Sequence, residues 1–292
     1  MQSSQGASLS PARDRDPLLP ASGLSSASLS SDDAFPLPPL YQRVARITAM
    51  VAWLLVSTVV TMAALTVLLL VPHRPDLRIS TCNLYGTVFG RGAMWLMGCP
   101  VKVMGQQYAG YGERRPAIFI ANHASALDIV LCMWLTPMHT IGIAKKEIVF
   151  FPVFGLLYLL SGHIRIDRSN RAKAVESMRK AGDIMVDRSL STMIWPEGTR
   201  SPTGRLVEFK KGVVHLAVQT GLPIVPIVLT GTQKAWPKGG GLAIRPVPVS
   251  VTFLPPVETV GWNTSTMGQH LAELRELYLQ HLPPDQQPLP GQ

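Results

Sequence analysis

The sequence predicts an α/β protein with a mixed, mostly parallel sheet flanked by helices, preceded by an N-terminal hydrophobic membrane helix or helical hairpin. Two observations predict this class. Between residues 101 and 258, short apolar runs alternate with stretches of helical spacing, which is typical of parallel strands joined by helices. Upstream, residues 47–71 contain no charged side chain. That run is longer than the roughly 20 apolar residues that a helix needs to cross a bilayer.

The composition favours contact with a membrane. The 292 residues are 47% hydrophobic and only 15% charged, whereas soluble domains carry about 25% charged residues. Twenty-seven Lys and Arg against eighteen Asp and Glu give a net charge of +9. This balance favours an anionic membrane surface or phosphorylated substrates. Charge alone also allows nucleic acid, but no nucleic-acid motif supports that alternative.

Four segments are predicted along the chain. Residues 1–40, rich in Ser and Pro, and residues 283–292, rich in Pro and Gln, are expected to be disordered tails. Residues 41–100 are the expected membrane-anchoring segment, because a second, weaker apolar stretch at 79–103 can complete a hairpin with the uncharged run. Residues 101–282 are the expected catalytic domain.

The cysteines indicate which side of the membrane the domain faces. Lys and Arg are nearly balanced around the uncharged run, so flanking charge does not decide the orientation. Cys82, Cys99 and Cys132 are odd in number and scattered, with no Cys-x-x-Cys pair and no zinc-ligand spacing. We therefore expect reduced thiols, no metal site, and a catalytic domain on the cytoplasmic face.

Periodicity predicts the elements of the domain. Apolar or alternating runs predict strands, and apolar residues three or four apart predict helices. The last helix places Leu271, Leu274 and Tyr278 on one face. The strands are expected within 116–123, 139–147, 162–168, 191–200, 223–232 and 246–254, several of them running into loops, and the helices at 171–187, 211–220 and 267–281.

His123 and Asp128 follow the first of these strands, in Asn-His-Ala-Ser-Ala-Leu-Asp. Ligands of α/β proteins bind at the carboxyl ends of strands. The two residues meet if His123 lies in the loop and Asp128 opens the next helix. Asp128 would then hold one imidazole nitrogen and leave the other as a base for a substrate hydroxyl. A capping Asp and a surface His are the alternative, and Ser125 as nucleophile lacks the Gly-x-Ser-x-Gly elbow.

Two further strands are expected to end at the same edge. Arg168 can place two donors on a phosphate, or form a solvated pair with Asp167. In the next loop, Glu197 can hold a substrate hydroxyl or an arginine, and Gly198 permits close backbone approach. Arg200 offers a second phosphate contact. Read alone, this loop also fits a simple turn.

Lys210 and Lys211 open the helix expected at 211–220. A helix N-terminus beside two lysines favours an anion, although the pair also fits an ordinary solvated surface. Residues 198–205 superficially resemble a phosphate loop, but they lack its Gly-Lys-Ser/Thr ending. This excludes a P-loop NTPase.

Taken together, four blocks in this order resemble the glycerolipid acyltransferases, and most closely the branch of 1-acyl-sn-glycerol-3-phosphate acyltransferases. The blocks are NHASALD at 122–128, GHIRIDR at 162–168, WPEGTRS at 195–201 and IVPIVL at 224–229. The likeness covers about residues 100–255, and the first and third blocks are the specific ones. Trp195 stands where the family often has Phe.

The resemblance implies transfer of a fatty acyl group from an acyl thioester to the sn-2 hydroxyl of 1-acyl-glycerol 3-phosphate, giving phosphatidic acid. It implies His123 as general base and Asp128 as its partner. No acyl-enzyme is needed, so Ser125 and the cysteines are expected to be dispensable. The partners implied are the lysophospholipid, the bilayer, and acyl-CoA or acyl carrier protein as donor, with no cofactor. The substrate-binding residues implied are Arg168, Glu197, Gly198, Thr199, Arg200, Lys210 and Lys211.

Other functions stay open from the sequence. The acceptor can instead be glycerol 3-phosphate, lyso-ornithine lipid or another lysophospholipid. A non-catalytic lipid-binding membrane protein has no need for the His/Asp pair. A thioesterase or lipase is disfavoured by the missing nucleophile elbow.

Overall fold

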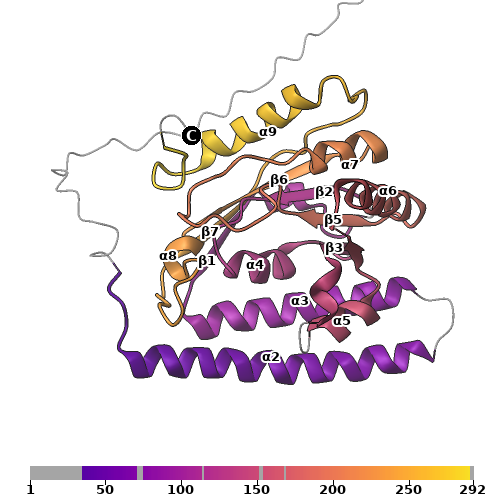
Figure 1. Ribbon diagram of the computed structural model, residues 1–292. Coiled ribbons are helices and arrows are strands. Elements are labelled where there is room, and N and C mark those ends of the chain that lie inside the picture. The colour runs from indigo at the N-terminus through magenta and orange to yellow at the C-terminus, as the bar shows by residue number, and fades with distance from the viewer. Residues whose placement is uncertain (1–34, 71–74, 114, 151–153, 168, 290–292) are drawn as a thin grey trace, which may run out of the picture. The chain divides into compact units, whose positions relative to one another are not determined.

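A seven-stranded sheet forms the centre of the computed structural model, which describes residues 35–70, 75–113, 115–150, 154–167 and 169–289 (Figure 1). The rest, including most of the expected N-terminal tail, lies outside the described residues. The strands in spatial order are β1 (Val101–Met104), β7 (Val249–Phe253), β6 (Ile224–Thr230), β2 (Ile118–Ala121), β5 (Ser191–Ile194), β3 (Thr140–Lys145) and β4 (Ile164–Ile166).

The sheet is mixed and mostly parallel, as the sequence predicts. β2 lies between β6 and β5, β5 pairs with β3, and β3 pairs with β4, all in parallel. β7 is antiparallel to β6, and β1 is parallel to β7. The carboxyl ends of β2, β3, β4, β5 and β6 therefore meet at one edge of the sheet. The short strand β1 was not predicted, because its four residues carry no distinct pattern.

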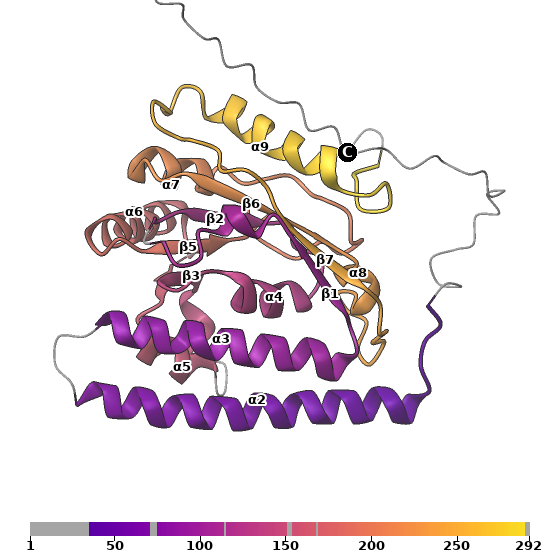
Figure 2. The ribbon, with the colours of Figure 1, turned by 180° about the vertical axis from the view of Figure 1, so that it is seen from behind.

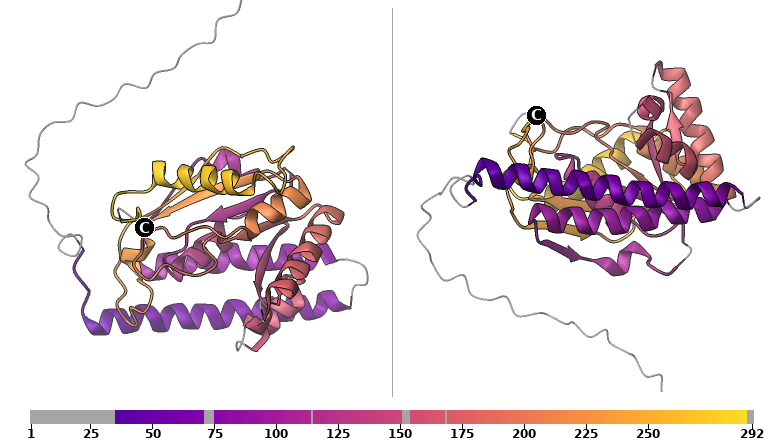
Figure 3. Two further views of the ribbon diagram at one scale, coloured as in Figure 1. Left: turned by 45° about the horizontal axis from the view of Figure 1, so that its top comes forward. Right: turned by 90° about the horizontal axis from the view of Figure 1, so that it is seen from below.

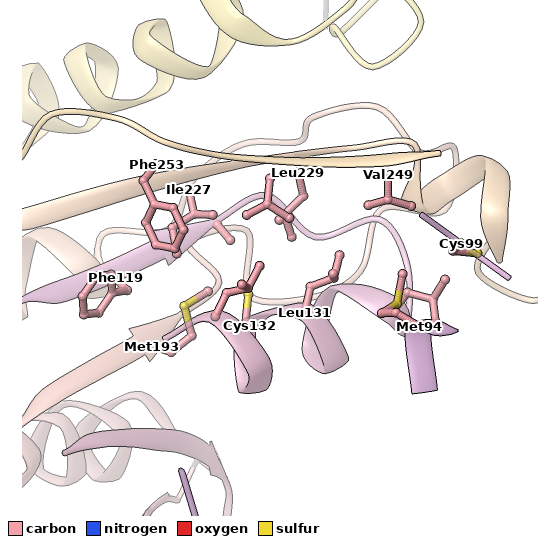
Figure 4. Packing of buried hydrophobic residues seen from close by; sticks show 14 of the residues in the cluster. Met94, Cys99, Phe119, Leu131, Cys132, Met193, Ile227, Leu229, Val249 and Phe253 are labelled. Carbon is pink, nitrogen blue, oxygen red and sulfur yellow. The ribbon is translucent and has the colours of Figure 1, made fainter. Parts of the chain in front are cut away.

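The sheet is covered on both faces (Figure 2). All of β2 is buried, with Ile118 and Ile120 packed toward α7 and α9, and Phe119 and Ala121 in the cluster that contains α4. Side chains alternate between the faces of a strand, so a strand covered on both sides has an uninterrupted apolar sequence. Figure 4 shows the cluster that contains α4, in which Leu131 and Cys132 face Ile227 and Leu229 of β6.

The helices follow the predicted pattern closely. α6 and α9 have the predicted bounds, and α7 begins one residue later than expected. On α9, Leu274 and Tyr278 are buried, and the Tyr278 hydroxyl donates to the Ile120 carbonyl at 2.7 Å. The helices are α2 (Leu40–Leu69), α3 (Pro75–Met97), α4 (Leu127–Leu135), α5 (Phe154–Ser161), α6 (Arg171–Asp187), α7 (Gly212–Thr220), α8 (Thr232–Ala235) and α9 (Met267–His281), with 3-10 turns at Gln106–Ala109 and Lys146–Phe150.

α2 and α3 form the expected hairpin and lie side by side (Figure 3). The Trp53 indole N–H on α2 donates to the Phe89 carbonyl on α3 at 3.1 Å. By length and composition, α2 is the one helix in the described part of the chain that fits a membrane span, with a mean hydropathy of 2.2 over its most apolar window. Its side chains Val56, Val59 and Val60 are exposed.

α3 also packs on the catalytic domain. A Cβ at Gly86 would lie 2.6 Å from the Met133 carbonyl oxygen, and a Cβ at Gly90 would lie 2.6 Å from that of Val130. The two glycines, four residues apart, therefore let α3 approach α4 closely. Met97 at the end of α3 is fully buried in the core. Hairpin and sheet thus belong to one packed unit.

Residues 283–289 pack against the domain, which differs from the disordered tail expected at 283–292. Gln286 is 1% exposed, and its side-chain amide donates to the Leu229 carbonyl. Pro- and Gln-rich composition predicts a tail because it offers few apolar side chains. In this segment, polar groups instead find partners on the backbone of the domain.

Candidate active site

Asn122 fixes the point where the chain leaves β2. Its side-chain amide donates to the Leu229 carbonyl at 2.9 Å and accepts from the Leu229 N–H at 2.8 Å. The side chain thus continues the β2–β6 pairing beyond Ala121, the last paired residue of the strand. This holds the next residue, His123, at the carboxyl edge of the sheet.

His123 and Asp128 form the predicted pair. His123 Nδ1 lies 2.9 Å from Asp128 Oδ2, and Asp128 is fully buried in the first turn of α4. The same oxygen accepts the N–H groups of Ala124 and Ser125, each at 2.7 Å. A carboxylate at a helix N-terminus is favourably placed. Here it also folds the loop back so that residues five apart meet.

The pairing leaves Nε2 of His123 as the lone-pair nitrogen. A carboxylate accepts hydrogen bonds, so Nδ1 carries the proton. No hydrogen bond to Nε2 comes from the described part of the chain. The His123 ring stacks on Trp195 with centroids 4.8 Å apart, which fixes the plane of the imidazole. In this geometry, Nε2 of His123 is oriented to accept a proton from a bound substrate.

Glu197 connects two loops through hydrogen bonds to their backbones. Sequence reasoning placed it among the substrate contacts, but its side chain is 1% exposed. One carboxylate oxygen accepts the His123 N–H at 2.6 Å, and the other accepts the Val207 N–H at 3.3 Å. Burial raises the pKa of Glu197 to about 7. Both oxygens are therefore used by the protein backbone.

The raised pKa predicts a specific pH dependence of stability. Because the folded state holds the Glu197 proton more tightly than the unfolded state does, this residue stabilises the fold at low pH. That contribution disappears as the pH rises from about 4.5 to about 7. We expect the free energy of unfolding of the wild type to fall over this range by about 3 kcal/mol relative to Glu197→Gln. Thermal melts of both proteins test this, and parallel curves would contradict it.

The loop after Glu197 contacts the histidine through its backbone. Gly198 has φ 73° and donates its N–H to the Trp195 carbonyl, so this N–H is not a free donor for an oxyanion. Thr199 is exposed. Ser201 donates its N–H to the His123 carbonyl at 2.7 Å, which joins the two loops directly beside Arg200.

Basic side chains surround this loop. Lys210 and Lys211 are exposed, and the stem of Lys210 lies against Gly198, 3.6 Å from where a Cβ would be. The structure adds Lys238, whose ammonium donates to the Arg200 carbonyl at 2.6 Å. The sequence did not point to Lys238 as a site residue. The one feature that marks it is a lone lysine before three glycines. Arg168 lies outside the described residues.

The expected partner of Arg168 is engaged elsewhere. Asp167, at the end of β4, pairs with Lys146 at 3.0 Å. The Ser169 N–H, with Lys146 beside it, holds the pKa of Asp167 below its usual range.

The alternative nucleophiles are not placed to react. The Ser125 hydroxyl donates to the Trp236 carbonyl at 2.7 Å and accepts the Leu127 N–H, in a fully buried position. All three cysteines are buried with free thiols, and burial raises the pKa of the Cys132 thiol well above its usual value. In the part of the chain that the structure describes, no group of three or more His, Cys, Asp or Glu is placed to hold a metal.

An apolar cavity of about 250 Å³ is lined in part by Trp195, the residue that stacks on His123. It extends between α3, α4, α5 and the strands β3 and β5. Its polar lining groups include His163, whose Nδ1 accepts the Gly142 N–H at 3.2 Å, and burial lowers the pKa of His163 to about 4. Other lining residues are Cys82, Tyr85, Gly86, Ile129, Cys132, Met133, Ile141, Ile143, Leu157, Tyr158 and Met193.

Comparison with known proteins agrees with this fold. Residues 100–230 match the family model named Acyltransferase. The 1-acyl-sn-glycerol-3-phosphate acyltransferase of Limnanthes douglasii is 45% identical over 225 residues, covering 77% of this chain and 78% of the relative. The one from Cocos nucifera is 46% identical over 246 residues, 84% of this chain and 77% of the relative.

More distant proteins carry the same likeness. The 1-acyl-sn-glycerol-3-phosphate acyltransferase of Salmonella typhimurium is 34% identical over 199 residues, covering 68% of this chain and 78% of the relative. The crystal structure of the 1-acyl-sn-glycerophosphate acyltransferase PlsC from Thermotoga maritima superposes with a TM-score of 0.65 at 23% identity, over 82% of this chain and 95% of that one. This neighbour shows the fold.

The fold and the site define the protein as an acyltransferase. More closely, the chain belongs to the family of 1-acyl-sn-glycerol-3-phosphate acyltransferases.

Proposed function

We propose that the protein transfers a fatty acyl group from an acyl thioester to the sn-2 hydroxyl of 1-acyl-sn-glycerol 3-phosphate, giving phosphatidic acid. The observation that carries this proposal is the oriented His123 next to an apolar cavity. Trp195 belongs to both, since it stacks on the imidazole and lines the cavity. The relatives bear the name of this reaction.

In this mechanism, His123 Nε2 accepts the proton of the acceptor hydroxyl while Asp128 stabilises the imidazolium that forms. The hydroxyl oxygen attacks the thioester carbonyl carbon, the carbon–sulfur bond breaks, and the sulfur takes the proton from His123. No protein nucleophile takes part. The buried hydroxyl of Ser125 and the buried thiols agree with direct transfer.

The cavity accounts for the fatty chain. Its lining is largely apolar, so an acyl chain that enters it loses contact with water. A chain that extends inward from Trp195 would bring its carbonyl carbon near His123. This placement holds the reacting atoms together, which supplies much of the rate in two-substrate reactions.

The hairpin supplies the membrane association. The outward valines of α2, and Leu84, Val88 and Trp95 of α3, are exposed apolar side chains. We place them in the bilayer. α3 also lines the cavity, so the hairpin contributes both to the exposed apolar surface and to the cavity wall. Three buried free cysteines favour the cytoplasmic face for the catalytic domain.

Arg200 is the proposed contact to the acceptor phosphate, together with Arg168, Lys210 and Lys211. We expect Arg200→Ala to raise KM for the lysophospholipid about tenfold or more, because charge-assisted bonds to phosphate contribute about 1.5–3 kcal/mol. KM for the acyl donor should stay unchanged. Kinetics with each substrate varied in turn test this, and an unchanged acceptor KM would remove Arg200 from the site.

The proposed function is tested with membranes that contain the protein, given labelled oleoyl thioester and lysophosphatidic acid. The thioester is supplied as the CoA form and, separately, on acyl carrier protein. Labelled phosphatidic acid is the expected product. Preference for glycerol 3-phosphate, lyso-ornithine lipid or another lysophospholipid would assign a different acceptor. Labelled free fatty acid alone would indicate a thioesterase, and no product from any pair would leave a non-catalytic lipid-binding protein.

A further inference from the structure

The segment 283–289, which we call the C-terminal strap, contacts the end of β6 and the loop of Glu197, and each of these bonds to the segment that carries His123. It follows α9 and lies beyond residues 100–230, the part that matches the family model. Its central residue is Gln286, which is 1% exposed. A buried amide costs free energy unless it is hydrogen-bonded, so its partners indicate what it does.

The side chain of Gln286 reaches the end of β6, which holds the residue before His123. Its amide donates to the Leu229 carbonyl at 3.2 Å. The same carbonyl accepts the side-chain amide of Asn122, and the Leu229 N–H returns a bond to the Asn122 oxygen. Asn122 is bonded directly to His123 in the chain. One path of contacts therefore runs from the strap to the histidine through β6.

The backbone of Gln286 reaches the loop of Glu197. Its carbonyl accepts the Leu206 N–H at 2.7 Å. The next residue, Val207, donates to one oxygen of Glu197, and the other oxygen accepts the N–H of His123. A second, separate path thus ends on the same histidine.

Side chains from the domain hold the strap on either side of Gln286. The Arg205 guanidinium donates to the carbonyls of Pro284 at 3.1 Å and Gln287 at 2.6 Å. Lys234 pairs with Asp285 at 2.8 Å. Arg205 lies in the loop before α7, and Lys234 lies in α8, which follows β6. The strap is therefore fixed between the loop that carries Glu197 and the helix after β6.

We propose that Gln286 is a positioning residue for acyl transfer. It sets the placement of His123 by connecting the end of β6 to the loop of Glu197. This inference rests on the function proposed above. The role of Gln286 is to hold His123 where the acceptor hydroxyl and the acyl carbonyl meet. It does not touch either substrate.

The test is Gln286→Met, which removes the amide and keeps the length of the side chain. Small displacements of a catalytic group reduce rate strongly; we expect kcat to fall about tenfold, with KM for donor and acceptor within about twofold of wild type. The matched control is Gln287→Met. The Gln287 amide donates to the carbonyls of Leu279 and Leu282 at the end of α9, so its loss should leave kcat unchanged.

Two outcomes of the kinetics overturn the proposal. One is an unchanged kcat in Gln286→Met. The other is a loss of activity that matches the fraction of unfolded protein, or that Gln287→Met shares, because either would show a role in stability alone. Melting temperatures of all three proteins, measured in the same detergent, make this distinction.

Hydrogen exchange tests the same point without any substrate. The amides of Leu206 and Val207 should exchange faster in Gln286→Met and faster still when the chain ends after Leu282, while peptides of α6 stay unchanged. Equal protection in all proteins would contradict the proposal. If the wild type forms no phosphatidic acid, the proposed function fails, but the exchange result still decides whether the strap positions the loops.

Discussion

His123→Ala is expected to lower acyl transfer by about 10²–10⁴-fold, the range that general-base catalysis contributes. The substitution removes the group that accepts the hydroxyl proton. Trp195 and the cavity stay in place, so donor binding should persist. The side chain is 8% exposed and lies at the edge of the sheet. Its loss leaves a gap near the surface, and we expect the variant to fold and stay membrane-bound.

The measurement is the rate of phosphatidic acid formation per amount of folded protein in membranes. Ser125→Ala serves as a control in the same loop, because its hydroxyl has only structural contacts. Retention of more than about a tenth of the wild-type rate by His123→Ala would remove it as general base.

Asp128→Asn is expected to lower the rate by about 10⁴-fold, the loss that the equivalent change causes in the serine protease triad. Asp128 Oδ2 accepts three N–H groups, those of His123, Ala124 and Ser125. An Asn oxygen can accept them too, so the loop should keep its shape. The negative charge that stabilises the imidazolium is lost. Asn can also turn its amide toward Nδ1 and reverse the tautomer.

Asn is the informative replacement, because Ala would leave buried N–H groups without partners. Kinetics and thermal melts of Asp128→Asn separate the two contributions. We expect a large loss in kcat with a melting temperature close to wild type. A normal kcat would show that Asp128 serves only to cap α4 and shape the loop.

Much of this site is predictable from the sequence, because its signals are local. The strand before Asn122 is an unbroken apolar run, and Asp128 opens the next helix, so spacing and strand ends allow His123 and Asp128 to meet. The resemblance of the first block to the acyltransferases then favours this pair over a capping Asp and a surface His. The same holds for α6 and α9, whose apolar residues recur at helical spacing. These elements carry their pattern within a few turns.

Other features depend on contacts between distant segments. Glu197 looks like a substrate ligand in its loop, and only the position of Val207 shows that both oxygens face backbone amides. Lys238 approaches Arg200 across 38 positions of sequence. Gln286 lies in a stretch whose composition predicts a tail. Composition and periodicity carry no information about such pairings.

The most direct test of the central claim is the position of the new ester. Membranes with the protein receive 1-oleoyl lysophosphatidic acid and a labelled acyl thioester, and the product is digested with a lipase specific for the sn-2 ester. The account predicts labelled phosphatidic acid whose label is fully released by that lipase, with at least about a hundredfold less formed by His123→Ala. Label that stays on the lipid, or that appears only as free fatty acid, would contradict it.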